Sequence, residues 1–269
     1  MRRIKLILIL LLAATTGLFF FAKFQKAVSG VDVGPTMECD QELVNVSVKD
    51  GESALISGVT ARDRQDGDLT DQIMVSGISK LINADTAKVT CIVFDSDDNM
   101  ASLVRYIRYT DYQRPTIHMN GSMTFTDAES AQMIAMLSAT DVIDGDISDS
   151  VRISMLKNTE RSNVYSVTAQ VTNSMGDTAR VELPVILEET NPNRPVIKLS
   201  EYLVYLEQGS SFDPDSYIET ITAQNRAFAA SEVVIDNPVD VNEPGTYWVY
   251  YTHTANNITG MTILTVVVQ

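Results

Sequence analysis

The chain has 269 residues, of which 45% are hydrophobic and 20% charged, so it is long enough for two or three small folded domains. This composition excludes a disordered chain, and 13 Gly with 8 Pro exclude a collagen-like or proline-rich one. The net charge of −15 argues against nucleic-acid binding, and two Cys with two His are too few for a Cys/His zinc site.

An uncharged apolar run, Leu6–Ala22, lies near the N-terminus. As a helix its 17 residues would span roughly 26 Å, near the lower limit for crossing the hydrocarbon core of a bilayer. Three basic residues precede it, so the positive-inside rule keeps the N-terminus cytoplasmic and places the rest of the chain outside the membrane. We therefore expect residues 1–29 to be a cytoplasmic stub and transmembrane signal-anchor. The three basic residues are Arg2, Arg3 and Lys5.

The alternative is a cleaved secretory signal, which would release a secreted protein. Small residues at 27–29 would allow cleavage before Gly30. The length of the apolar run, and the positions of Lys23 and Lys26 after it, favour the uncleaved anchor. From Asp32 onward the chain carries all 35 acidic residues but only 15 of the 20 basic ones, so a basic head precedes a strongly acidic body.

The acidic body contains an internal repeat. Asp63–Asp71 recurs as Asp141–Asp149, 78 residues further on, and Val93–Ala101 matches Val171–Ala179 at the same offset. Two separate matches at one offset make a chance resemblance unlikely, so we infer repeated modules of about 78 residues.

The boundaries of the copies carry a second pattern. Arg114–Ile117 and Arg194–Ile197 begin the second and third copies with the same Arg-Pro pair, and Pro35–Met37 begins the first. The third copy lacks the acidic turn, and Gln224–Ala227 stands about where that turn should be. The repeat predicts three domains, at residues 31–111, 112–190 and 191–269.

Each copy has the pattern of short strands. Lys88–Val93 and Val164–Val171 alternate with period 2, and Met261–Val268 is a β-branched closing strand. The one helical candidate, Ala128–Leu137, lacks an apolar face over three turns. We therefore predict an all-β fold of tandem Ig-like β-sandwiches, preceded by one N-terminal transmembrane helix.

The body resembles bacterial immunoglobulin-like cell-surface domains, specifically the family first delimited in an insecticidal crystal protein. Ala61–Thr70 and Ala139–Ser148 carry its Asp-x-x-Asp-Gly-Asp piece, and Gly245–Tyr251 carries its Gly-x-Tyr-x-Val-x-Tyr piece. The resemblance covers roughly residues 31–269. It implies modules repeated on a secreted or surface protein, and it implies no single activity.

The acidic turns raise the question of a metal site. In an Ig-like sandwich each turn would lie at the same pole as the loop before the last strand, so their carboxylates could gather there and suit Ca²⁺. We favour the other interpretation, in which Asp side chains accept main-chain N–H bonds in tight turns. We expect no cofactor, with Ca²⁺ as the alternative. The candidate calcium ligands are Asp63, Asp66, Asp68, Asp141, Asp144 and Asp146.

The densest aromatic group lies in one strand of the third copy. Alternation places Trp248 and Tyr250 on the face opposite Tyr247 and Tyr251. If exposed, Trp248 and Tyr250 could contact a sugar ring or a surface protein. In the other interpretation they cover a sheet face or the neighbouring module, which would favour a spacer.

Enzymatic chemistry has little support in the sequence. His118 and His253 fall in different copies, and no nucleophile with a partner base is recognisable. Cys39 and Cys91 both fall in the first copy, either as a disulfide or as two buried thiols, and we slightly favour the thiols.

The sequence thus predicts a non-enzymatic, single-pass membrane protein whose extracellular Ig-like repeats act as a surface stalk or as an adhesive or binding module. The alternative is an accessory scaffold subunit of a membrane-bound or secretion complex. The expected partners are the membrane and a surface protein or glycan. Nucleic acid and small-molecule substrates are not expected.

Overall fold

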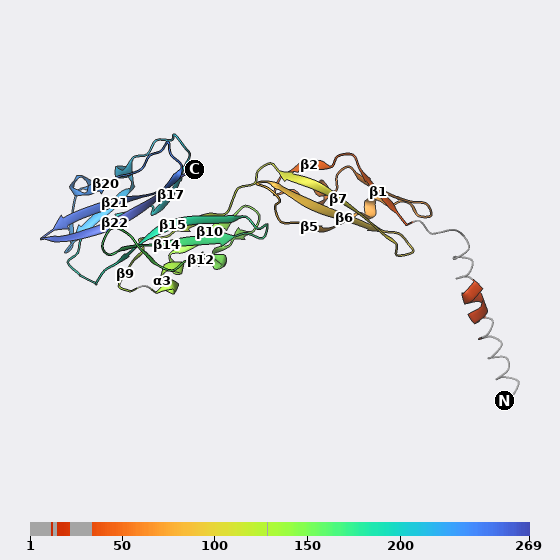
Figure 1. Cartoon of the computed structure of the whole chain (residues 1–269), viewed down its shortest axis with the longest axis horizontal. Helices are drawn as coiled ribbons and strands as arrows, with labels where there is room; N and C mark the ends of the chain where they lie inside the picture. The colour runs from red at the N-terminus through yellow and green to blue at the C-terminus, as the bar shows by residue number, and fades with distance from the viewer. Residues whose placement is uncertain (1–11, 13–14, 22–33, 128) are drawn as a thin grey trace, which may run out of the picture. The chain divides into compact units, whose positions relative to one another are not determined.

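The computed structural model describes residues 12, 15–21, 34–127 and 129–269, and the chain divides into two compact units (Figure 1). Unit 1 contains the described residues up to 46, with 50–78 and 87–108; unit 2 contains 47–49, 79–86 and 109–269. Strands account for most of the regular structure in both units, so the all-β prediction is confirmed.

Unit 1 consists mainly of the first copy, with one sheet of three strands and one of four. Alternation along the four-stranded sheet buries Val89, Cys91 and Val93, none of which has exposed surface, and these residues form the core. The strand orders are β1-β3-β4 and β2-β7-β6-β5, with β1 Thr36–Cys39, β2 Leu43–Val46, β3 Val59–Asp63, β4 Gly67–Asp68, β5 Met74–Ile78, β6 Thr86–Phe94 and β7 Met100–Tyr109.

The second copy, in unit 2, repeats this arrangement. Its long hairpin pairs nine residues from each of two strands, and Val167, Ala169 and Val171 point from it into the core. The strand orders are β11-β10-β8 and β12-β14-β15-β9, with β13 also paired to β14; the strands are β8 Thr116–Met119, β9 Thr124–Phe125, β10 Leu137–Asp141, β11 Gly145–Asp146, β12 Arg152–Ile153, β13 Lys157–Asn158, β14 Val164–Thr172 and β15 Thr178–Leu187.

The third copy completes unit 2. Val249, Tyr251, Leu264 and Val266 have no exposed surface and form its core. The strand orders are β16-β18-β19 and β17-β22-β21-β20, with β16 Val196–Leu199, β17 Leu203–Leu206, β18 Ile218–Ala223, β19 Arg226–Ala227, β20 Val234–Asp236, β21 Gly245–Ala255 and β22 Ile258–Val268.

Short helices lie between strands in all three copies. One of them, α3 (Ser130–Ala135), lies in the segment where the sequence predicted no helix, so that prediction is wrong there. A helix this short needs only one buried anchor, and Met133, 1% exposed, supplies it without an apolar face over three turns. The others are α2 Glu52–Leu55 and 3₁₀ helices at Thr70–Gln72, Ser148–Ser150, Pro214–Tyr217 and Ala230–Glu232.

The predicted membrane anchor falls mostly outside the described residues. Of Leu6–Ala22, the structure describes only Leu12 and 15–21, and the alternative cleavage point near Gly30 is not among the described residues. Within the described part of the chain, no helix has both the length and the apolar character needed to cross a membrane.

Candidate functional site

The acidic turn of the first copy is held by its own carboxylates. One Asp63 oxygen accepts the main-chain N–H groups of Gln65 (2.5 Å) and Asp66 (2.9 Å), and these hydrogen bonds lower the pKa of Asp63. Asp66 in turn accepts the main-chain N–H of Ser96 at 2.7 Å and its hydroxyl at 2.9 Å. The turn after β3 is thereby tied to the turn after β6.

The second copy makes the same contacts. Asp141 accepts the main-chain N–H groups of Ile143 and Asp144, each at 2.9 Å. Asp144 accepts the N–H and the hydroxyl of Ser174, at 2.6 and 2.7 Å. The sequence repeat is therefore also a repeat of a tertiary contact.

The last aspartate of each triplet begins the 3₁₀ helix that follows. Asp68 accepts the N–H of Thr70 at 3.0 Å, and Asp146 accepts the N–H and hydroxyl of Ser148 at 3.0 and 2.6 Å. Hydrogen bonds from Thr70 and Ser148 lower the pKa of Asp68 and of Asp146. Within the described residues, no three His, Cys, Asp or Glu side chains are grouped as metal ligands. Asp63, Asp68, Asp141 and Asp146 therefore cap their own turns, whereas Asp66 and Asp144 bond to the serine of a second turn.

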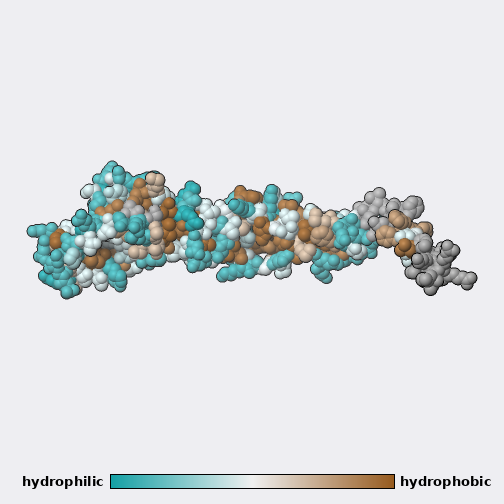
Figure 2. All heavy atoms as spheres, turned by 90° about the horizontal axis from the view of Figure 1, so that it is seen from below, coloured by the Kyte–Doolittle hydropathy of each residue, from teal (hydrophilic) through white to brown (hydrophobic). Residues whose placement is uncertain are grey.

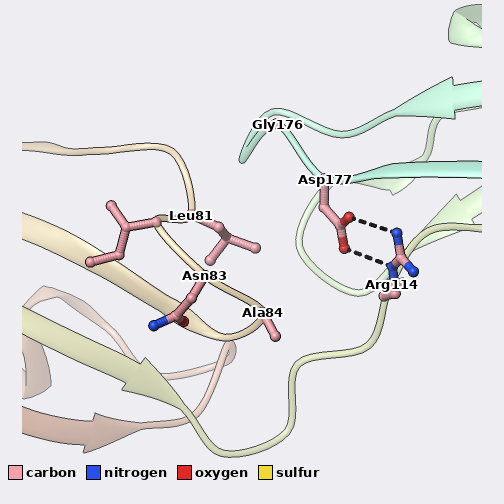
Figure 3. A pocket seen from close by; sticks show the side chains of 7 residues that line it. Leu81, Asn83, Ala84, Arg114, Gly176 and Asp177 are labelled. Atoms are coloured by element: carbon pink, nitrogen blue, oxygen red, sulfur yellow. Dashed lines mark hydrogen bonds and ion pairs between the residues drawn. The ribbon is translucent and has the colours of Figure 1, made fainter.

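A network of polar side chains extends the second turn toward the start of its copy. The amide of Asn173 donates to Asp141 at 3.0 Å and to the Tyr112 hydroxyl at 2.9 Å. Tyr112 donates to Asp177 at 3.0 Å, and Arg114 makes two 3.2 Å hydrogen bonds to the same carboxylate (Figure 3). Arg114 comes from the Arg-Pro pair that the repeat pattern identified only as a boundary.

The electrostatics of this network favour an ionised Asp177. Burial opposes ionisation, but hydrogen bonds from Arg114 and Tyr112 outweigh it, so the pKa of Asp177 lies below its ordinary value. Burial raises the pKa of Tyr112, and the bond to Asp177 raises it further. The Arg114 guanidinium therefore neutralises the Asp177 carboxylate.

A cavity of about 350 Å³ lies beside this ion pair, within unit 2 (Figure 3). Its other wall is the segment 81–84, whose Leu81 N–H donates to the carbonyl of Met175 at 2.9 Å. Arg114 also donates to the carbonyl of Thr178 at 2.9 Å. Because Arg114 and Asp177 bond to each other, a ligand in this cavity would meet a neutralised ion pair and no unpaired charge from these two residues.

Trp248 and Tyr250 lie where the third copy contacts the second. The indole N–H of Trp248 donates to the carbonyl of Glu182 at 3.2 Å, and the Arg161 guanidinium lies 3.9 Å from the centroid of the Tyr250 ring. Arg161 also forms an ion pair with Asp236. Both aromatic side chains are half-buried. They pack against a buried apolar cluster formed by Val164, Ile186 and Ile263.

The same two aromatic residues line an open groove of about 530 Å³. Lys157 and Glu160 from the second copy and Pro238 from the third also line it. The sequence placed Trp248 and Tyr250 on a common face, but it did not identify Arg161, which covers one of them. Arg161 lies between β13 and β14, and only the folded chain brings its guanidinium over the Tyr250 ring.

Tyr205 and Arg194, both of the third copy, make further contacts within unit 2. The Tyr205 hydroxyl donates to the carbonyl of Ile117 at 3.0 Å, and burial raises the pKa of Tyr205 to about 12. Arg194 donates to the carbonyl of Thr259 at 3.3 Å and pairs with Glu188 at 3.0 Å. The Arg-Pro pairs of the second and third copies therefore each hold the closing hairpin of their own copy.

The histidines and cysteines stand apart from these contacts. His118 lies 3.0 Å from the Thr140 hydroxyl, whereas buried His253 contacts the carbonyl of Glu232. Cys91 is buried, Cys39 is half-buried, and both are free thiols. The absence of enzymatic activity remains a prediction.

Comparisons with known proteins do not identify the chain. No protein-family model matches it, and no curated protein matches it. Among solved structures, the M60 catalytic domain with CBM51 modules of Clostridium perfringens ZmpB is 11% identical with a TM-score of 0.25, covering 87% of this chain and 30% of that one.

A protocadherin GammaB4 extracellular domain is 12% identical with a TM-score of 0.20, covering 89% of this chain and 50% of that one. The chain thus spans half or less of the length of these two structures. At such scores the similarity carries no argument about this chain.

Proposed function

We propose that this chain is a non-enzymatic, membrane-anchored extracellular protein whose Ig-like β-sandwich repeats form a surface stalk with an adhesive or binding role. The observation that supports the stalk most directly is the junction between the second and third copies. Trp248 and Tyr250, the aromatic residues best suited to a ligand, are engaged there with Glu182 and Arg161.

Such a junction suits a stalk. Two sandwiches joined only by a short linker would reorient freely, whereas a hydrogen bond, a cation–π contact and a buried apolar cluster restrict that motion. The acidic body supports a surface location, because its charge keeps it soluble and repels like-charged neighbours. The groove beside Trp248 leaves room for a ligand at the same place.

The single tryptophan of the chain provides a direct test. We would follow denaturant unfolding of the full-length chain in detergent by Trp fluorescence and by far-UV circular dichroism. In the unaltered chain the fluorescence transition should coincide with the loss of β-structure in unit 2. Arg161→Ser should move the fluorescence transition to a lower denaturant concentration, because it removes the contacts to Tyr250 and Asp236. The expected loss in the free energy of unfolding is about 1 kcal/mol.

The matched control is Arg64→Ser, in an exposed turn of unit 1, which should leave the Trp signal unchanged. If Arg161→Ser and Arg64→Ser give superimposable fluorescence curves, the junction does not couple the copies, and the proposal of a stalk loses its support.

A further inference from the structure

One face of the four-stranded sheet in unit 1 is unusually apolar. Apolar side chains lie on its outward positions, and Met100 and Val104 are 58% and 55% exposed. Figure 2 shows apolar side chains gathered on the surface over unit 1. A soluble protein rarely leaves such a patch uncovered. We call this the β6–β7 face, and its apolar residues are Leu43, Met74, Ile92, Phe94, Met100, Val104 and Tyr106.

The charges of the β6–β7 face are separated along the strands. β6 and β7 form a hairpin, closed where the Asp95 N–H donates to the carbonyl of Asn99 at 3.1 Å. Lys88 and Arg108 point outward at the open end of this hairpin. The connecting turn at the other end carries Asp97 and Asp98.

The strands themselves add no negative charge to the face. Their outward positions hold no carboxylate, although the chain has 35 acidic residues. The face is therefore an apolar strip with a basic end and an acidic end.

This pattern is complementary to itself in one orientation. If two copies meet face to face with their strands antiparallel, the basic end of each lies against the acidic turn of the other. Parallel packing would place like charges together, which is unfavourable. A two-fold axis in the interface and perpendicular to the strands produces the antiparallel arrangement with identical contacts on both copies.

We propose that the β6–β7 face binds the same face of a second copy of this chain, with the strands antiparallel. This goes beyond the proposed function, since it concerns unit 1 and does not depend on the junction at Trp248. With strands about 4.8 Å apart, β6 and β7 roughly 30 Å long and β2 and β5 roughly 15 Å long, the face presents about 430 Å² per copy. Stable interfaces bury about 800 Å² per partner, so the dimer should be weak and sensitive to concentration.

The test is sedimentation of the full-length chain in detergent micelles over a range of protein concentrations. The unaltered chain should associate reversibly into dimers. Val104→Asp places a charge in the middle of the apolar strip and should abolish the association. Because Val104 is 55% exposed, unit 1 should still fold and unfold cooperatively, with only a small drop in melting temperature from the lower strand propensity of Asp, which separates loss of binding from loss of folding.

Charge exchange tests the orientation. Lys88→Glu alone and Asp97→Lys alone should each weaken association, on the order of tenfold, because each places like charges at both contacts of the antiparallel dimer. The chain that carries both changes should recover association, since each end then again meets its opposite. An equimolar mixture of the two single variants should recover it as well.

Three results would overturn the proposal. The first is a chain that stays monomeric at every concentration, which would mean that something else covers the face. The second is association that Val104→Asp does not reduce, since it would arise elsewhere, for example in the N-terminal segment. The third is a double variant that associates no better than either single one, because this is incompatible with antiparallel contacts.

Discussion

Asp66 and Asp144 show how single residues hold two turns of a sandwich together. Each carboxylate accepts both the main-chain N–H and the hydroxyl of one serine in the turn after the long strand, Ser96 in the first copy and Ser174 in the second. A carboxylate that bonds two donors on another segment does more than shape its own turn. It fixes the distance between two turns at one pole of the sandwich.

At this scale we predict that Asp66→Ala destabilises unit 1 by about 1 kcal/mol, because two donors on Ser96 lose their acceptor. The matched control is Asp71→Ala, in the following 3₁₀ helix, which should change stability by less than half as much. Urea unfolding monitored by far-UV circular dichroism measures both. Equal losses would show that the Asp66 contact contributes nothing particular to stability.

At the scale of elements, close backbone contacts decide how the hairpins pack. The third copy replaces the acidic turn by Gln224 and Asn225, both with positive φ, so a two-residue turn joins β18 to β19. Further along, Gly260 in β22 lies against the start of the copy. A Cβ there would come 1.9 Å from the carbonyl oxygen of Pro195. Neither feature involves a charged side chain.

We predict that Gly260→Ala destabilises unit 2 by about 1–3 kcal/mol. The new Cβ would clash with the main chain of Pro195, which cannot move aside as easily as the end of a flexible side chain. Gly77→Ala is the control, since its Cβ would meet no atom within 4 Å. Differential scanning calorimetry of the two variants makes the comparison. A Gly260→Ala chain with an unchanged melting temperature would contradict the close approach of β22 to Pro195.

At the scale of the whole molecule, unit 2 contains a polar network within its second copy whose contribution to stability depends on ionisation. The pKa of Asp177 is lowered on folding, so the native state holds fewer protons than the unfolded state below neutral pH. Stability from this group is therefore fully present above the ordinary aspartate pKa of about 3.9 and is lost as pH falls through the lower folded value.

This gives a pH prediction for unit 2. The urea concentration at the midpoint of its unfolding should decrease below about pH 4. Asp177→Asn should lower this midpoint at pH 7 and make it change less as the pH falls. Asp149→Asn is the control, because Asp149 is exposed in the 3₁₀ helix Ser148–Ser150 and lies outside the network. Parallel pH profiles for the unaltered chain and Asp177→Asn would contradict the role given to the network.

Local features of this fold follow from the sequence, whereas contacts between distant residues do not. Alternation in Lys88–Val93 and Val164–Val171 correctly predicted buried strands, because a period of two is imposed by the backbone itself. The first and last aspartates of each triplet form the expected turns, since each bonds its own neighbours in sequence. The link from Asp66 to Ser96 was not predicted, because it joins residues that only the paired sheets bring together.

The sequence by itself determined the all-β fold class, the repeat and the acidic turns, because these follow from local backbone periodicity and short-range hydrogen bonding. The tertiary structure alone decided which residues cover Trp248 and Tyr250 and that Arg114 pairs with Asp177. It also decided the burial of Arg105 on β7, which is 1% exposed. Arg105 occupies an inward position where alternation predicts an apolar residue. It is accommodated there because the carbonyls of Ser57 and Gln41, distant in sequence, accept its N–H groups. Contacts of this kind depend on the pairing of sheets, which no local pattern encodes.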